Sequence, residues 1–338
     1  MRKLYTLQYL RAFAALAVVY SHATIQVPEW KVWLPHAGAF GVDVFFVISG
    51  FIMVYIARPE DTPANFMSHR IRRVVPLYWF FTVLMATILV SLPNVFRNAS
   101  FEIGAFFESL LFIPHWSIAD PNFIWPILAP GWSLNYEMYF YLAFAASLLL
   151  PPRFRIAFIA AVIGAIWLLC QFFGNERSAI TGFYGDSIVF EFVFGMLLAR
   201  AFKGGFELSN GVATVLIVFG TLLLVVLELA QLPLPRIVTL GIPSLMLVTG
   251  VVFLHWPRLA WLEYLGDASY ALYLSHIFVL GVLRAVLPRF LPEGPLGAWL
   301  FVFLSLVICT LASIFFHRYV DNWLLRTERL SQLRPRSV

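Results

Sequence analysis

The chain has 338 residues, of which 61% are hydrophobic and only 12% are charged, and its formal net charge is +5. A soluble domain carries about 25% charged residues, so this composition excludes an ordinary soluble protein. It predicts an integral membrane protein that contacts membrane lipid. The positive charges cluster in short segments between apolar stretches, which argues against a nucleic-acid partner.

Hydropathy and helix-breaking residues predict an all-α bundle of about ten transmembrane helices. The expected spans are 6–25, 38–57, 74–93, 132–150, 156–173, 183–200, 211–230, 237–254, 268–287 and 297–316. Between the third and fourth spans, residues 103–113 and 123–128 are apolar but short and are broken by prolines. We expect interfacial or re-entrant pieces there, or alternatively one more span.

The distribution of lysine and arginine predicts the topology. With the N-terminus placed in the cytoplasm, sixteen of the 23 basic residues fall on the inner side and six on the outer side, while Arg11 lies within the first span. This asymmetry predicts that both termini are cytoplasmic. We divide the chain into a transmembrane domain, residues 1–320, and a basic cytoplasmic tail, residues 321–338.

Two ionisable residues, Arg11 and His22, stand inside the first predicted span. An ionisable side chain within a membrane is costly, so it indicates a functional site. Eleven residues correspond to about three helical turns, so both side chains face the same way, roughly 16 Å apart along the helix axis. The predicted topology places Arg11 toward the cytoplasm and His22 toward the outside.

Two carboxylates are predicted at the depth of His22. Asp43 begins the second span, in GVDVFFVISGF, and Glu137 lies one turn into the fourth, in GWSLNYEMYFY, near Ser133. A carboxylate beside an imidazole can orient it and raise its basicity, as around a general base. A carboxylate neutralised by a structural partner is the alternative.

Arg70 and Arg73 lie one helical turn apart at the predicted cytoplasmic start of the third span. Guanidinium groups suit phosphate recognition because they donate paired hydrogen bonds. From the residues alone, ordinary positive charge on an inner loop is the favoured interpretation.

Weaker candidates lie in the sixth and ninth predicted spans. Asp186 and Glu191 are carboxylates in the sixth, and Tyr270 and His276 lie in SYALYLSH of the ninth. A histidine among aromatic residues is more often a buried structural residue than a substrate ligand. The histidine spacing predicts no metal site, and the chain has no phosphate-binding glycine loop.

Taken together, these stretches resemble the acyltransferase family 3 membrane proteins, in particular the branch that acetylates exopolysaccharides such as succinoglycan. The resemblance rests on five motifs in the family's order, from residue 7 to residue 276. They are the Arg-x10-His pair Arg11 and His22, the GVDxFFxxSGF stretch 41–51, the RxxRxxPxYW stretch from Arg70 to Trp79, the W-S-L-x-x-E stretch from Trp132 to Glu137, and the SYxxYLxH stretch from Ser269 to His276. The family often carries an E-x-P element after its last span, where this chain reads YVDNWL.

The resemblance implies a membrane O-acyltransferase that acetylates an extracellular or envelope glycan, with cytoplasmic acetyl-CoA as donor and no permanently bound cofactor. It implies that Arg70, Arg73 and Arg11 bind the acyl-CoA. His22 would then be the general base or a transient acyl carrier, with Glu137 or Asp43 orienting it.

The acceptor that best fits the resemblance is a lipid-linked repeat unit of an exopolysaccharide, undecaprenyl-linked, in a bacterial inner membrane. O-antigen, peptidoglycan, Nod factor and a macrolide-like small molecule are the alternatives. Ser133, Tyr270 and His276 are weaker candidates for binding it.

Two other classes of protein remain open at this stage. Intramembrane Arg, His and Glu also suit a polytopic transporter or flippase of a polysaccharide intermediate, although no interrupted helices recur in two halves. A non-catalytic scaffold of a polysaccharide assembly complex is a third possibility. Binding or hydrolysis of acetyl-CoA separates the enzyme from the transporter, and tolerance of His22→Ala would mark the scaffold.

Overall fold

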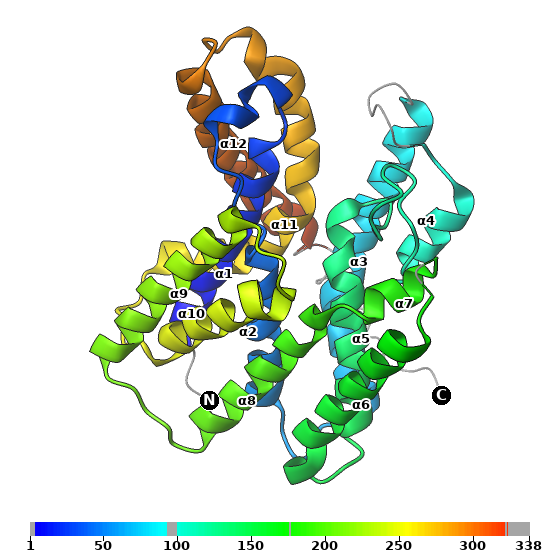
Figure 1. Ribbon diagram of the computed structural model, residues 1–338, viewed down its shortest axis with the longest axis vertical. Helices are drawn as coiled ribbons and strands as arrows, with labels where there is room; N and C mark the ends of the chain where they lie inside the picture. Colours follow the sequence, from blue (N-terminus) through cyan, green and yellow to red (C-terminus); the bar gives the residue numbers. More distant parts are fainter. Residues whose placement is uncertain (1–3, 93–99, 176, 322, 324–338) are drawn as a thin grey trace. The chain divides into compact units, whose positions relative to one another are not determined.

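The computed structural model describes residues 4–92, 100–175, 177–321 and 323, and within them every regular element is helical (Figure 1). The α-helices are α1 (Tyr5–Thr24), α2 (Gly41–Ile56), α3 (Pro63–Ser91), α4 (Ile103–Leu110), α5 (Trp132–Ser147), α6 (Pro152–Phe173), α7 (Ala179–Tyr184), α8 (Glu191–Lys203), α9 (Asn210–Ala230), α10 (Ile242–Phe253), α11 (Ala260–Val286) and α12 (Pro295–Phe316). Short 3₁₀ segments lie at Pro28–Trp33, Ala129–Gly131, Ser187–Phe190 and Leu287–Arg289, and π-helical turns at Ile237–Gly241 and His317–Asp321. The all-α prediction is confirmed for these residues, and most of the predicted tail lies outside them.

Five helical stretches of the described residues are long and apolar enough to cross a membrane. They are Pro63–Ser91, Pro152–Phe173, Asn210–Ala230, Ala260–Arg289 and Pro295–Asp321. Two shorter apolar helical stretches are Gly41–Ile56 and Ile237–Phe253. The chain is thus a helical membrane protein, while the count of ten spans and the orientation of the termini stay predictions.

The helix that carries the predicted third span is longer than that span. α3 begins at Pro63, because Thr62 caps it by accepting a hydrogen bond from the backbone N–H of Asn65 at 3.3 Å and proline suits the first helical turn. At about 1.5 Å per residue, its 29 residues are longer than the hydrocarbon thickness of a bilayer. The added turns carry Arg70 and Arg73.

The continuous helix predicted over residues 183–200 is wrong. α7 ends at Tyr184, and α8 begins at Glu191 after a 3₁₀ turn. Asp186 ends the apolar run, since its carboxylate accepts a hydrogen bond from the backbone N–H of Ile188 at 2.9 Å and caps that turn. This carboxylate, a weak site candidate in the sequence, therefore has a local structural role.

The described chain forms two compact units. Unit 1 comprises residues 1–56 and 194–319, and unit 2 comprises residues 57–193 with the segment from Val320 onward. In unit 1, α1 contributes to two apolar cores. One joins it to α2, α8, α9 and α10, and the other joins it to α11 and α12. This double packing encloses the helix that carries Arg11 and His22.

Unit 2 is built around α3, which packs on α4 and α5, while α5 packs on α6. Aromatic rings fill this contact. Phe66 of α3 stacks on Phe144 of α5 with ring centroids 4.9 Å apart, and Tyr78 of α3 donates a hydrogen bond to the carbonyl of Ser109 at 3.0 Å. Unit 2 therefore fixes α3, with Arg70 and Arg73, against α5, with Glu137.

Candidate active site

His22 lies near the C-terminal end of α1, and its ring is held by its own helix. Its Nδ1 is 2.9 Å from the carbonyl oxygen of Val18, one turn earlier. A carbonyl can only accept, so Nδ1 carries the proton and Nε2 keeps a lone pair. The side chain stays partly exposed. This tautomer leaves Nε2 as the basic atom, and a backbone carbonyl orients the ring.

A second histidine, His276 of α11, lies against His22. The two ring centroids are 4.9 Å apart and the rings meet edge to face at 64°. The Nδ1 of His276 is 3.3 Å from the carbonyl oxygen of Leu272, again one turn earlier, so Nε2 is its acceptor atom. His276 is fully buried, and its Nε2 has no hydrogen-bond partner. A buried unsatisfied group costs about 1–3 kcal/mol, so this one calls for an explanation.

Close packing of α1, α11 and α12 holds the two histidines in place. The core around them contains Val19 of α1, Leu272 of α11 and Cys309 of α12. Near the other end of α1, Gly266 of α11 lies so close to the backbone of Gln8 that a Cβ atom would overlap the Gln8 carbonyl. The site is therefore built on rigid helices.

A third histidine, His36, lies in the loop before α2. Its Nδ1 is 3.0 Å from the hydroxyl of Thr24, whose own proton goes to the carbonyl of Ser21 at 2.8 Å. Burial, together with the nearby charge of Lys31, lowers the pKa of His36 below its ordinary value. His36 is therefore neutral near pH 7.

Arg11 also belongs to unit 1 and is half-buried in α1. Its Nη1 donates a hydrogen bond to the side-chain carbonyl of Gln8 at 3.0 Å. One helix thus carries both members of the Arg-x10-His pair.

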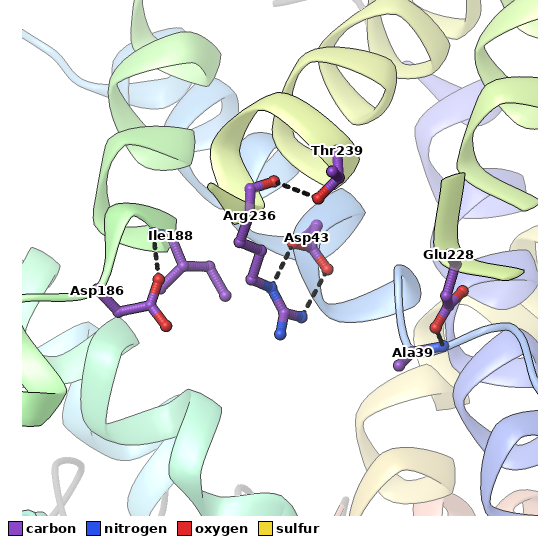
Figure 2. A network of polar contacts seen from close by, with 7 residues as sticks. All are labelled: Ala39, Asp43, Asp186, Ile188, Glu228, Arg236 and Thr239. Carbon is purple, nitrogen blue, oxygen red and sulfur yellow. Dashed lines mark hydrogen bonds and ion pairs between the residues drawn. The ribbon is translucent and has the colours of Figure 1, made fainter. Parts of the chain in front are cut away.

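Asp43, at the start of α2, forms an ion pair that the sequence did not predict. Its two carboxylate oxygens accept hydrogen bonds from Nε and Nη2 of Arg236, each at 2.8 Å, and Asp43 is fully buried (Figure 2). In the sequence, Arg236 is one of the six basic residues on the predicted outer side, and its neighbouring apolar span gave it no further role. Its position before an apolar helix, matched in depth to Asp43, was the available signal.

Glu228, near the end of α9, is a second carboxylate that sequence reasoning missed. Its carboxylate accepts hydrogen bonds from the backbone N–H groups of Gly38 and Ala39 at 2.7 and 2.9 Å, and Figure 2 shows the bond to Ala39. A glutamate within a strongly apolar segment was the signal that could have found it. It fixes the turn that leads into α2 and hence to Asp43.

In unit 2, Glu137 and Arg70 are joined through one tyrosine. The hydroxyl of Tyr141 donates to the Glu137 carboxylate, one turn earlier on α5. The Arg70 guanidinium lies 6.0 Å from the centre of the Tyr141 ring and 5.6 Å from that of Phe66, within the range of cation–π contacts. Glu137 was predicted to lie on the acceptor side, and Arg70 was predicted to bind the acyl donor. In the structure both belong to one cluster.

The remaining predicted residues occupy ordinary helical positions. Arg73 lies 3.7 Å from the carboxylate of Asp321, in the segment that departs from the family's E-x-P element. Ser133 is buried and donates a hydrogen bond to the carbonyl of Pro130 at 3.2 Å, and Tyr270 is half-buried in α11. Arg11, His22, Asp43, Tyr270 and His276 belong to unit 1, whereas Arg70, Arg73, Ser133 and Glu137 belong to unit 2.

Ser109 and His115 form a serine–histidine contact in unit 2 that could be mistaken for a nucleophile and its base. The Ser109 hydroxyl lies 3.2 Å from Nε2 of His115, but Ser109 is fully buried. The same hydroxyl donates to the carbonyl of Ala105 at 2.6 Å and accepts from the backbone N–H of Ile127 at 2.9 Å. Through these bonds the Ser109 hydroxyl holds the loop before α5 in place.

The long apolar helices of the described residues define a helical membrane protein, and α1 carries a histidine whose Nε2 is its acceptor atom. The chain belongs to the acyltransferase 3 family, whose model, described as an acyltransferase domain, matches residues 4–318. The protein is therefore an O-acyltransferase. Among the described residues, no three His, Cys, Asp or Glu side chains are grouped so as to hold a metal ion.

Three relatives place the chain within this family. It is 35% identical to "Exopolysaccharide production protein ExoZ" of Rhizobium meliloti, over 86% of this chain and 91% of that protein. It is 27% identical to "Acyltransferase MdmB" of Streptomyces mycarofaciens, over 80% and 77% of the two chains. It is 26% identical to "Peptidoglycan O-acetyltransferase OatA" of Listeria monocytogenes, over 56% of this chain and 32% of that protein. No solved structure matches the chain.

Proposed function

We propose that the protein transfers an acetyl group from cytoplasmic acetyl-CoA to a hydroxyl of an exopolysaccharide or other envelope glycan at the bacterial inner membrane. The observation that carries this proposal is the geometry of His22, whose Nδ1 is tied to the Val18 carbonyl so that Nε2 is the basic atom. The family supports acyl transfer. The relative named for exopolysaccharide production, matched over most of both chains, supports a glycan acceptor. We propose a lipid-linked repeat unit as the form of that acceptor.

In the proposed reaction, Nε2 of His22 takes the proton from a sugar hydroxyl while the hydroxyl oxygen attacks the thioester carbonyl carbon. The carbon–sulfur bond breaks, and His22 returns the proton to the departing CoA thiolate. General base catalysis of this kind contributes typically about 10²- to 10⁴-fold. In an alternative route, His22 accepts the acetyl group on Nε2 before the sugar does, and an acetylated His22 trapped with acetyl-CoA alone would identify that route.

The arginines are assigned to the donor. Arg70 and Arg73 bind the phosphate groups of CoA, and their spacing of one helical turn on α3 supports a shared ligand. Arg11 contacts the donor deeper in the membrane, on the helix that carries His22. Ser133 and Tyr270 are assigned weaker contacts with the acceptor.

The two carboxylates are assigned different roles. Asp43 acts on His22 indirectly, by fixing the start of α2 through its ion pair with Arg236. Glu137, bonded to Tyr141 and close to Arg70 through that ring, is the acid that can orient or neutralise groups at the reacting centre. Glu137→Gln keeps the hydrogen bond and removes the charge, so it tests that role.

The experiment is mass spectrometry of the surface polysaccharide from a deletion strain complemented with variants. We expect the polysaccharide to lose the mass of one acetyl group per modified sugar in the deletion strain and to regain it with the wild-type gene. His22→Ala and Arg11→Ala should fail to restore it at normal protein levels.

A matched control is His255→Ala, which removes an exposed histidine from the loop between α10 and α11. It should restore acetylation fully. Normal acetyl content with both His22→Ala and Arg11→Ala would rule out this site. Purified wild-type protein that neither binds nor hydrolyses acetyl-CoA would favour the transporter.

A further inference from the structure

His276 is a buried polar residue to which the reaction above gives no role. It lies in the packed contact of α1, α11 and α12, with His22 on one side and Cys309 of α12 near its backbone carbonyl at 4.0 Å. Its exposed fraction is 0%. An apolar ring of the same size would pack here without leaving a nitrogen atom unsatisfied, so packing alone does not explain a histidine.

The two histidines have the same hydrogen-bond arrangement but different access. In each ring Nδ1 donates to the carbonyl one turn earlier on its own helix, so each Nε2 is an acceptor. His22 is partly exposed, whereas Nε2 of His276 is sealed from solvent and has no partner. His22 can therefore meet a substrate, and His276 can act on the reaction only through His22.

We propose that His276 is a positioning residue that packs edge to face with the His22 ring and stabilises the imidazolium that forms when His22 takes the hydroxyl proton. This inference rests on the proposed function. The positive charge that appears on His22 would lie beside a neutral ring whose centroid is 4.9 Å away and whose Nε2 lone pair has no other partner. The interaction is stronger with the charged His22 than with the neutral one, so it favours the transition state over the ground state.

The experiment compares three variants of the purified full-length protein in lipid nanodiscs. The probes are labelled acetyl-CoA and the glycolipid fraction of the deletion strain, which carries the unacetylated acceptor. His276→Phe keeps a ring of similar size and removes the nitrogen, His276→Gln offers an amide oxygen near the position of Nε2, and His276→Asn offers one only near Nδ1. Ser275→Ala, the neighbouring buried residue, is the matched control.

We expect His276→Phe and His276→Asn to lower kcat about 10- to 100-fold, with both KM values nearly unchanged. This loss is smaller than the roughly 10²- to 10⁴-fold of general base catalysis itself, because His276 acts only through His22. His276→Gln should recover much of the loss, and Ser275→Ala should match the wild type. All rates are expressed per folded, monodisperse protein. If His276→Phe does not fold, the Gln and Asn variants carry the test, since both remove the ring.

Three results would overturn the proposal. A His276→Phe variant with wild-type kcat would make His276 a packing residue and leave the proposed function intact. A raised KM for the acceptor at unchanged kcat would make it a substrate-binding residue. Wild-type protein that transfers no acetyl group would overturn the proposed function itself, and this inference with it.

Discussion

Both carboxylate oxygens of Asp43 are bonded to the guanidinium of Arg236, 193 positions further along the chain. Asp43 is fully buried, while 29% of the Arg236 side chain is exposed. Breaking a buried ion pair by removing one partner typically costs about 3–5 kcal/mol, because the other charge is left uncompensated. The partial exposure of Arg236 places this pair toward the lower end.

We therefore expect Asp43→Asn and Arg236→Gln each to destabilise the purified protein, and the double variant to be more stable than the sum of the two losses predicts. Thermal unfolding in detergent, followed by tryptophan fluorescence, measures both effects. Strictly additive losses would show that the pair is not coupled. Acetylation per folded molecule should fall by a similar factor in both single variants, since both release the start of α2.

The fold class and the helix that carries Arg11 and His22 could be predicted because they depend on local signals. Hydropathy located the apolar helices, and the spacing of Arg11 and His22 placed them on one helix. The partners of His22 could not be predicted, because His276 is 254 positions away and a histidine among aromatic residues has the pattern of an ordinary core residue. The same holds for Asp43, whose partner is chosen by how α2 packs near α10.

One local prediction failed for a local reason. The span over 183–200 was predicted as continuous from hydropathy, whereas Asp186 caps a 3₁₀ turn and interrupts it. The predicted third span falls on the later part of α3, which starts earlier because Thr62 and Pro63 signal a helix start. In both places capping residues set the helix bounds that hydropathy does not show.

Two glycines of α11 differ in their surroundings and give a matched pair of substitutions. A Cβ atom at Gly266 would overlap the carbonyl of Gln8 on α1, whereas a Cβ atom at Gly281 would meet nothing within 4 Å. We expect Gly266→Ala to push α11 away from α1 and to lower both thermal stability and acetyl transfer. Gly281→Ala should be neutral or stabilise by up to about 1 kcal/mol, as alanine does within a helix. Equal melting temperatures for the two variants would contradict the close approach.

Ser109→Ala tests whether the serine–histidine contact of unit 2 takes part in catalysis. The substitution removes the acceptor of the Ile127 N–H and one partner of His115, so we expect a loss of about 1–3 kcal/mol in stability. Acetyl transfer per folded molecule should stay at the wild-type level. A complete loss of transfer in a folded Ser109→Ala variant would instead identify Ser109 as a nucleophile.

The lowered pKa of His36 predicts that the folded protein becomes less stable as the pH falls. Its pKa in the folded protein is below the ordinary value, mainly because of burial, so the unfolded chain binds the proton more readily. His36 therefore lowers the stability of the fold as the pH falls through about 6.5, the ordinary pKa of histidine. His36→Asn keeps a donor for Thr24 and cannot titrate, so its melting temperature should fall less than that of the wild type between pH 7.5 and pH 5.5. An identical fall would exclude His36 as a source of the acid sensitivity.

The role proposed for Arg70 and Arg73 predicts that substituting them weakens the binding of acetyl-CoA without slowing the chemical step. If Arg70 and Arg73 hold the phosphates of CoA, Arg70→Gln and Arg73→Gln should each raise the KM for acetyl-CoA, by about tenfold for a loss of roughly 1.4 kcal/mol, and leave kcat nearly unchanged. Arg70→Lys should restore little, because an ammonium group cannot form paired hydrogen bonds and makes a different contact with Tyr141. Arg153→Gln removes one positive charge from an exposed position at the start of α6. It therefore controls for the effect of lower overall positive charge on the KM for acetyl-CoA. An equal rise in KM for Arg153→Gln would attribute the effect to the overall positive charge, whereas a fall in kcat alone would move Arg70 and Arg73 from the donor site to the reacting centre.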